Sequence, residues 1–393
     1  MTGMCGDSHG DLITGGGRTL DELKHEVLRR VERALTPVGG IKVDDAKAAL
    51  DAIDSLSREQ WARAWSAVAE KHFEAAQSQE RADPHNAAQS YWNAWRLHHF
   101  ARWPTENTPA KRHARDRALV AFRSYCRLLK PAIDVLRIPF HGKEIVAYLR
   151  LPDGVRPAPI VLGISGLDSR KEDVASQTDG YLRHGVGIIA ADMPGTGEAP
   201  IIAARPDSDS MFSAVIDYLQ TCSDVDAKRI VVQGRSFSGH WAAKLAYTER
   251  ERVRGCVVHG GGIHHSFQRE WSEPALKTPD YLYDYLEARR AMLGAAEGED
   301  VYAKIRAFSL LDQGLLDRPS APMLVINGYL DPQTTCEDVF ELLRHGDAKD
   351  AWVNPRGRHM GRSPEWPGSR IQEEVLMPWM LRRLQSRMRD RQT

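Results

Sequence analysis

One short stretch, Val231-Val232-Gln233-Gly234-Arg235-Ser236-Phe237-Ser238-Gly239-His240, indicates how this chain folds. A run of β-forming residues, Arg229–Val232, leads into it, and a helical pattern, Trp241–Glu249, follows it. Such a strand–turn–helix junction holds a serine hydroxyl out at the end of the strand. Small residues, Gly234 and Ser238, stand two positions to either side of Ser236 because the turn is sharp. Ser238 stands where glycine is usual. The stretch therefore predicts that Ser236 is a nucleophile.

The chain has two textures, and the first is helical. Between residues 18 and 131, apolar side chains recur at the spacing of helix faces. We expect helices over about 18–35, 44–56, 57–79, 86–103 and 109–130. Ser57 followed by Gln60 predicts a capping box at the start of the third helix. Residues 18–131 are therefore expected to form an N-terminal helical domain.

After Pro131, short β runs alternate with helices. The expected strands are 133–139 and 145–151, which form a hairpin, followed by 159–164, 186–191, 229–232, 253–258, 323–326 and 351–353. Apolar strands that alternate with helices predict a parallel sheet covered on both faces. Residues 132–393 are therefore expected to form an α/β domain with a mostly parallel sheet.

Two features modify this pattern. Helical, aromatic-rich sequence at about 260–318 interrupts the alternation and predicts a cap insertion. A C-terminal helix is expected over 371–388, with a bend at Pro378, because proline lacks the backbone N–H that a helix needs there.

The serine needs a base, and the base needs an acid to orient it. In the α/β-hydrolase fold, the acid and then the histidine follow the serine along the chain. Asp331 follows the apolar strand at 323–326, and His359 lies in a glycine-containing loop after the strand at 351–353. Both positions are carboxyl ends of strands, where ligands bind in open α/β sheets. We expect Ser236 as nucleophile, His359 as general acid–base and Asp331 as its orienting acid.

An acyl transfer site also needs two N–H groups that bind the developing oxyanion. The backbone N–H of Phe237, directly after the serine, is the first candidate. The loop after the strand at 159–164 contains Gly166, which lets the backbone turn, so the N–H of Leu167 is the second. The glycine-containing loop Asp192–Glu198 lacks the lysine and spacing of a phosphate loop and is expected to shape the pocket wall.

Substrate contacts are expected from the insertion and the helical domain. The segment that opens the insertion carries His264, His265 and Glu270 after a glycine run, which suits a binding segment. Their alternative role is helix capping and surface solvation. Tyr91 and Trp95 recur at helical spacing, and such a stripe is more often domain packing than pocket.

Composition restricts the class of protein. Basic and acidic side chains number 53 each, so nothing favours a nucleic acid or an anionic membrane as partner. The five cysteines are scattered without a CxxC pair, which predicts reduced thiols and a cytoplasmic protein. Residues 1–17 are glycine-rich without the apolar core of a signal peptide and are expected to be a flexible leader.

No metal site is expected. The adjacent histidine pairs, 98/99 and 264/265, diverge on a helix or strand, and no HExxH motif or cysteine partner accompanies them.

Several segments together resemble one α/β-hydrolase group, which includes 2,6-dihydroxypseudooxynicotine hydrolase, the fungal yellowish-green heptaketide pigment hydrolase and FrsA-like proteins. The matching segments are 88–104, 166–172, 192–198, 234–236 and the loops of Asp331 and His359. The resemblance implies an α/β-hydrolase fold with the N-terminal helical domain as a lid, no cofactor, a small-molecule substrate and a homodimer.

The resemblance also implies a reaction. Its first form is hydrolysis of a C–C bond adjacent to a ketone in an aromatic or polyketide-like substrate, through an acyl-enzyme. A carboxylesterase, thioesterase or acyltransferase on the same triad is the second form. A third possibility is a non-catalytic FrsA-like binding protein. The intact order of serine, aspartate and histidine is evidence against it.

Overall fold

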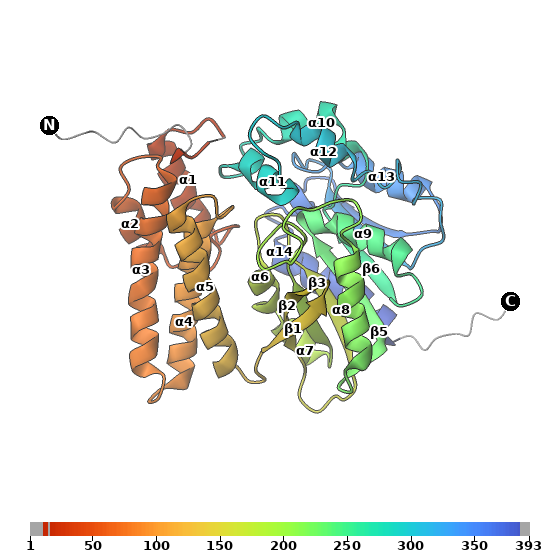
Figure 1. The fold of residues 1–393 in the computed structure, drawn as a ribbon, viewed down its shortest axis with the longest axis horizontal. Helices are drawn as coiled ribbons and strands as arrows, with labels where there is room; N and C mark the ends of the chain where they lie inside the picture. Colours follow the sequence, from red (N-terminus) through yellow and green to blue (C-terminus); the bar gives the residue numbers. More distant parts are fainter. Residues whose placement is uncertain (1–10, 15, 386–393) are drawn as a thin grey trace. The chain divides into compact units, whose positions relative to one another are not determined.

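The computed structural model describes residues 11–14 and 16–385 (Figure 1). The chain divides into two compact units. Among the described residues, the helical unit comprises those up to 132 and 279–288, and the sheet unit comprises 133–278 and those from 289 onward. Most of the expected leader, residues 1–17, lies outside the described residues. Of its described part, Leu12 forms a β-bridge with Ser57 and Ile13 is buried.

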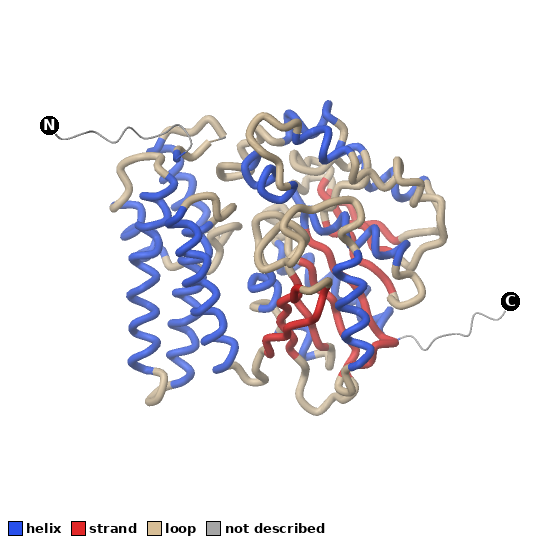
Figure 2. Tube along the Cα trace, in the orientation of Figure 1, coloured by secondary structure: helices blue, strands red, loops and turns tan. Residues whose placement is uncertain are grey.

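The helical unit contains the five expected helices, with bounds that differ from the predicted ones by up to five residues, at the end of the second helix. They are α1 (Leu20–Glu32), α2 (Val43–Asp51), α3 (Arg58–Gln79), α4 (Pro84–Arg102) and α5 (Pro109–Leu128). Short connections join α3, α4 and α5, so these three run antiparallel side by side (Figure 2).

The expected capping box at α3 is half formed. The Ser57 hydroxyl accepts a hydrogen bond from the Gln60 backbone N–H at 3.3 Å, as predicted. The Gln60 side chain does not return this bond to Ser57 but accepts from the backbone N–H of Ser55 at 3.0 Å. The Ser57 N–H donates to Ser55 Oγ at 3.3 Å instead, a contact with the preceding turn that sequence spacing does not reveal.

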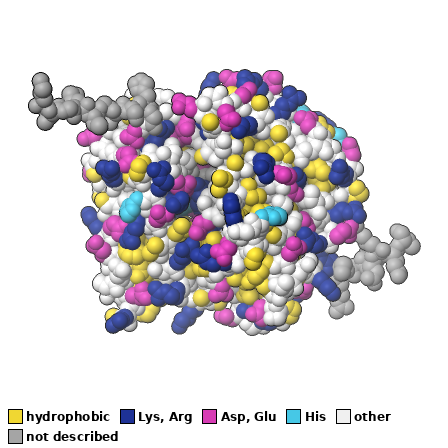
Figure 3. All heavy atoms as spheres, in the orientation of Figure 1, with side chains coloured by type: hydrophobic (Ala, Val, Ile, Leu, Met, Phe, Trp, Pro, Cys, Tyr) yellow, Lys and Arg dark blue, Asp and Glu magenta, His cyan; other side chains and the backbone are white. Residues whose placement is uncertain are grey.

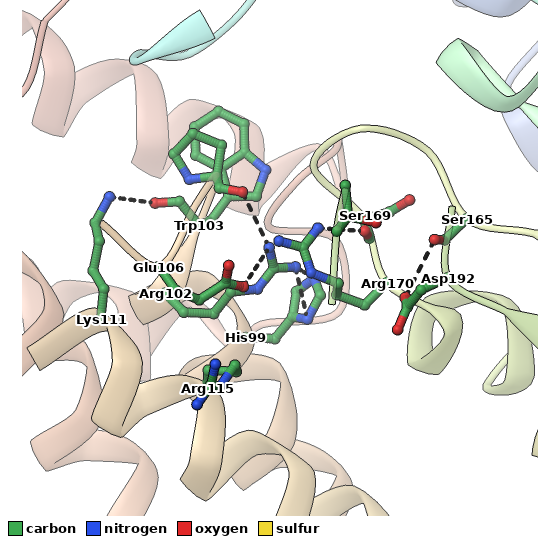
Figure 4. A network of polar contacts seen from close by, with 12 residues as sticks. His99, Arg102, Trp103, Glu106, Lys111, Arg115, Ser165, Ser169, Arg170 and Asp192 are labelled. Atoms are coloured by element: carbon green, nitrogen blue, oxygen red, sulfur yellow. Dashed lines mark hydrogen bonds and ion pairs between the residues drawn. The ribbon is translucent and has the colours of Figure 1, made fainter. Parts of the chain in front are cut away.

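The segment 279–288, which falls inside the expected insertion, belongs to the helical unit. Asp284 explains this, because its buried carboxylate accepts from Arg58 Nε and Nη2, both at 2.8 Å. Lys111 Nζ lies 3.8 Å from the same carboxylate and donates to the Trp103 carbonyl at 3.0 Å (Figure 4). Burial lowers the pKa of Lys111 to about 8 although Asp284 acts to raise it.

The sheet unit is built on one eight-stranded sheet in the order β1-β2-β4-β3-β5-β6-β7-β8. Its strands are β1 (Asp134–Phe140), β2 (Lys143–Arg150), β3 (Ala158–Ile164), β4 (Gly187–Ala191), β5 (Val225–Arg235), β6 (Gly255–His259), β7 (Met323–Gly328) and β8 (Asp350–Asn354). Strands β1, β2 and β4 pair antiparallel, and all other pairs are parallel. The predicted α/β fold with a mostly parallel sheet is confirmed.

Helices flank this sheet, and α8 lies in front of it in the view of Figure 1. The helices that follow β3 along the chain are α6 (Lys171–Ala175), α7 (Asp179–Arg183), α8 (Ser210–Thr221), α9 (Gly239–Thr248), α10 (Arg269–Ala275), α11 (Tyr285–Leu293), α12 (Val301–Arg306), α13 (Glu337–Arg344), α14 (Gly368–Ile371) and α15 (Met377–Gln385). The first four residues of α11, 285–288, belong to the helical unit. A π-helical turn, Gln372–Leu376, replaces the simple bend expected at Pro378. Proline cannot donate to the carbonyl four residues back, so the hydrogen-bond ladder changes register ahead of it.

Charge is mixed on the surface drawn in Figure 3, where basic and acidic side chains are interspersed. This agrees with the equal counts of the two signs in the sequence. Within the described residues, no helix combines the length and the apolar character that crossing a membrane requires.

Candidate active site

Ser236 lies in a sharp, strained turn at the carboxyl end of β5. Its φ is 55°, in the left-handed region that non-glycine residues rarely adopt. This conformation costs about 1–3 kcal/mol. Two glycines allow the chain to approach itself closely here. A Cβ on Gly234 would collide with the Ser238 carbonyl, and a Cβ on Gly239 would lie 2.6 Å from the Gly261 backbone nitrogen. The turn therefore has the geometry predicted for it.

The structure brings the three expected triad residues together. Ser236 Oγ lies 2.7 Å from His359 Nε2, and His359 Nδ1 lies 2.8 Å from Asp331 Oδ2. A carboxylate only accepts hydrogen bonds, so Nδ1 carries the imidazole proton and Nε2 presents a lone pair to the serine hydroxyl.

Asp331 is held in place by its own loop. Its Oδ1 accepts from the backbone N–H groups of Gln333 at 2.8 Å and Thr334 at 3.2 Å, while Oδ2 faces His359. The carboxylate is fully buried. Both of its oxygens are thus committed, which fixes the orientation of the imidazole.

The loop that carries Leu167 passes directly beside Ser236. A Cβ added to Gly166 would lie 3.2 Å from the Ser236 Cβ, so only glycine fits without displacement. The Gly166 N–H donates to Ser169 Oγ at 2.7 Å, which closes the turn. The Phe237 N–H thus directly follows Ser236 in sequence, and the Leu167 N–H directly follows Gly166, which lies against Ser236.

Ser238, the departure from the usual glycine, has a partner in this loop. Its side chain is buried, and its hydroxyl donates to the Ser165 carbonyl. This bond connects the turn at Ser236 to the loop of Gly166 and Leu167. Close packing of strand and helix is preserved because Gly239 supplies the missing Cβ space instead.

A buried charge cluster anchors the same loop, and sequence reasoning missed it. Asp192 Oδ1 accepts from Ser165 Oγ at 3.3 Å (Figure 4). It also accepts from the Lys171 backbone N–H at 2.7 Å. Lys171 Nζ lies 2.9 Å from Glu172, 3.0 Å from Asp192 and 2.8 Å from Glu198. Burial alone would lower the pKa of Lys171, but these carboxylates hold that pKa well above its ordinary value.

A signal for this cluster was present in the sequence. Lys171, Glu172, Asp192 and Glu198 are charged residues that follow closely after two fully apolar strands. The fold buries Lys171, Glu172 and Asp192 and leaves Glu198 partly exposed, and buried charges must be paired. The loop Asp192–Glu198, expected to shape the pocket wall, thus supports the Leu167 loop through Asp192 and Glu198.

The expected substrate contacts in the insertion have other partners. His264 Nδ1 lies 2.7 Å from Ser309 Oγ, and His265 Nε2 lies 3.0 Å from Glu341. Asp338 accepts from the backbone N–H groups of both histidines, at 2.8 and 2.7 Å. The side chain of Glu270 is exposed on α10.

Tyr91 and Trp95 lie in the core of the helical unit. The Tyr91 hydroxyl donates to Glu80 at 2.7 Å, and its ring packs edge-on against Phe73. Trp95 is buried against Phe122, with ring centroids 4.8 Å apart. These contacts account for both side chains as packing residues of that unit.

Among residues 11–14 and 16–385, no group of three or more histidine, cysteine, aspartate or glutamate side chains is arranged to hold a metal ion.

Comparison with known proteins agrees with this architecture. Residues 40–350 match the family described as esterase FrsA-like. Esterase FrsA of Vibrio cholerae serotype O1 is 27% identical over 295 residues, which cover 74% of this chain and 69% of the Vibrio protein.

Two solved structures share the fold. The 2,6-dihydroxy-pseudo-oxynicotine hydrolase has a TM-score of 0.73 at 22% identity and covers 88% of this chain and 94% of its own. AbyA5 wild type has a TM-score of 0.68 at 22% identity and covers 93% of each chain. The family match spans most of the sequence, and the chain therefore belongs to the FrsA-like esterase family and is a hydrolase of the α/β-hydrolase type.

Proposed function

We propose that Ser236, His359 and Asp331 are the catalytic triad of a serine hydrolase that works through an acyl-enzyme. The observation that carries this proposal is the unbroken path of hydrogen bonds from the serine hydroxyl through the imidazole to the buried carboxylate, at 2.7 and 2.8 Å. The strained φ of Ser236 supports it, because backbone strain at the serine is typical of a nucleophile elbow.

The chemistry follows from these contacts. His359 Nε2 takes the hydroxyl proton as Ser236 Oγ attacks a substrate carbonyl carbon. The oxyanion receives hydrogen bonds from the N–H groups of Phe237 and Leu167. When the tetrahedral intermediate collapses, the imidazolium returns its proton to the leaving group. Water, activated by the same imidazole, then hydrolyses the acyl-enzyme.

For the bond that is cleaved, we propose the C–C bond adjacent to a ketone in an aromatic or polyketide-like substrate. The leaving carbanion in a β-diketone or acyl-phenol is delocalised as an enolate or phenolate, which His359 can protonate. The resemblance of segments 166–172 and 192–198 to such hydrolases supports this choice. Ester hydrolysis is the second candidate, and the FrsA-like esterase family match favours it.

One assay separates the two bonds. Purified protein is incubated with p-nitrophenyl acyl esters and, in parallel, with acyl-phenol β-diketones, and both products of each reaction are followed by mass spectrometry. We expect the diketone to yield a carboxylic acid and a ketone or phenol fragment at a rate abolished in Ser236→Ala. Rapid ester turnover without diketone cleavage would reject the C–C bond and leave the esterase.

A further inference from the structure

His259 is a buried histidine that occupies a central position behind the triad. It ends β6, the strand between β5, which leads into Ser236, and β7, which leads toward Asp331. In the sheet register it pairs with Arg235, the residue before the serine. Its Nε2 lies 2.9 Å from the backbone carbonyl of Met360, the residue after His359.

The direction of this hydrogen bond is fixed by its acceptor. A carbonyl oxygen only accepts, so His259 Nε2 carries a proton and donates it. Burial lowers the pKa of His259 to about 3, so the ring stays neutral at working pH and keeps this tautomer. His259 is therefore a fixed donor and not a second acid–base group.

The turn that His259 contacts is itself strained. Met360 has φ 64°, in the left-handed region, and this conformation presents its carbonyl to His259. Gly260 packs closely against Met360, because a Cβ on Gly260 would lie 2.8 Å from Met360 Cγ. On the other side, Asn354 Nδ2 donates to the Gly361 carbonyl at 2.8 Å. The loop of His359 is thus clamped at two successive carbonyls.

We propose that His259 is a positioning residue, whose Nε2–H holds the Met360 carbonyl and so fixes the turn that presents His359 to Ser236. This inference rests on the triad proposed above. A base must stay within hydrogen-bond reach of the proton that it removes, and a displacement of about 1 Å can cost on the order of a hundredfold in rate.

The test measures the rate constant for phosphonylation of the protein by a fluorophosphonate, which requires the same proton transfer from the serine. Molecules that fail to fold lower the amplitude of labelling but not its rate constant. We expect His259→Leu to react about 10–100-fold more slowly than the native protein. His259→Gln, whose side-chain amide places an N–H at a similar distance from Cα, should restore most of the rate.

Cys256→Ala is the matched control. Cys256 is buried in the same strand and, three residues earlier, points to the opposite face of the sheet. This variant should react at the native rate even where it lowers the melting temperature.

The outcomes separate the two proposals. Failure of the native protein to label, or continued labelling of Ser236→Ala, would overturn the triad and with it the role of His259. If labelling depends on Ser236 but His259→Leu reacts at the native rate, His259 has no positioning role. The same conclusion follows if His259→Gln is as slow as His259→Leu, or if Cys256→Ala is equally slow.

Discussion

Ser238→Ala tests how the elbow is joined to the loop that carries Leu167. The substitution removes one hydroxyl oxygen and leaves the Cβ in place. In the native chain this hydroxyl donates to the Ser165 carbonyl from a fully buried position. Ser165 is in turn joined to Asp192, so the bond connects the serine turn to the charge cluster beneath the loop.

The expected magnitude follows from the burial of both groups. A buried carbonyl that loses its donor costs about 1–3 kcal/mol of the free energy of unfolding. For a domain of about 150–250 residues this lowers the melting temperature by about 2–4 °C per kcal/mol, or about 2–12 °C in all. We expect kcat to fall about tenfold, less than the 10²–10³ that complete loss of an oxyanion donor costs, because Leu167 is displaced but present.

Thermal unfolding and steady-state hydrolysis of a p-nitrophenyl ester measure these two effects. Thr221→Val is the control, because the Thr221 hydroxyl also donates to a backbone carbonyl, at 2.7 Å, but from an exposed helix end. Its stability should change by less than about 0.5 kcal/mol. A Ser238→Ala protein that melts and turns over like the native one would refute the reasoning that this bond supports the loop.

Asp331→Asn should lower kcat by about 10⁴-fold with little change in melting temperature, because the amide favours the wrong imidazole tautomer; a loss below about tenfold in steady-state kinetics would contradict the triad. Lys171→Met should lower the free energy of unfolding by about 3–5 kcal/mol in urea titrations, because Asp192 loses its buried cation, and an unchanged midpoint would show that the cluster is not desolvated. Burial lowers the pKa of His240 to about 3, so between about pH 6.5 and 3 the unfolded chain binds a proton that the folded chain does not. The contribution of His240 to stability should therefore be complete above pH 6.5 and fall toward pH 3. In urea titrations at several pH values, the free energy of unfolding of His240→Leu should fall with pH less steeply than that of the native protein, by up to about 1.4 kcal/mol per pH unit. Identical slopes of the free energy of unfolding against pH would contradict the burial of a neutral imidazole.

The fold was accessible from the sequence because its signals are local. Apolar runs bounded by glycine or proline predict strands such as 159–164, observed as Ala158–Ile164. Helical spacing predicts a helix over 57–79, observed as Arg58–Gln79. The order of Ser236, Asp331 and His359 at strand ends predicted which side chains would meet, since carboxyl ends of parallel strands share one edge of the sheet. Their contact distances agree with this expectation, and their catalytic roles stay a proposal.

What the sequence did not reveal depends on partners distant along the chain. Asp284 lies within the expected insertion, yet its bond to Arg58 places segment 279–288 in the helical unit. In the sequence, Ser238 is a departure from the usual glycine, and its spacing does not identify the Ser165 carbonyl as the acceptor of its hydroxyl. Spacing along the chain indicates on which face of a helix or strand a residue lies. The hydrogen-bond partner of a buried polar group is set by tertiary packing.

The most direct measurement of the central claim is the site and rate of covalent capture by a fluorophosphonate. The labelled protein is digested, and the modified peptide is located by mass spectrometry in native, Ser236→Ala and His359→Ala proteins. We predict one adduct per chain, on the peptide that contains Ser236, absent in Ser236→Ala and formed far more slowly in His359→Ala. An adduct on another residue, or native-rate labelling without His359, would contradict the assignment of a reactive hydroxyl activated by that imidazole.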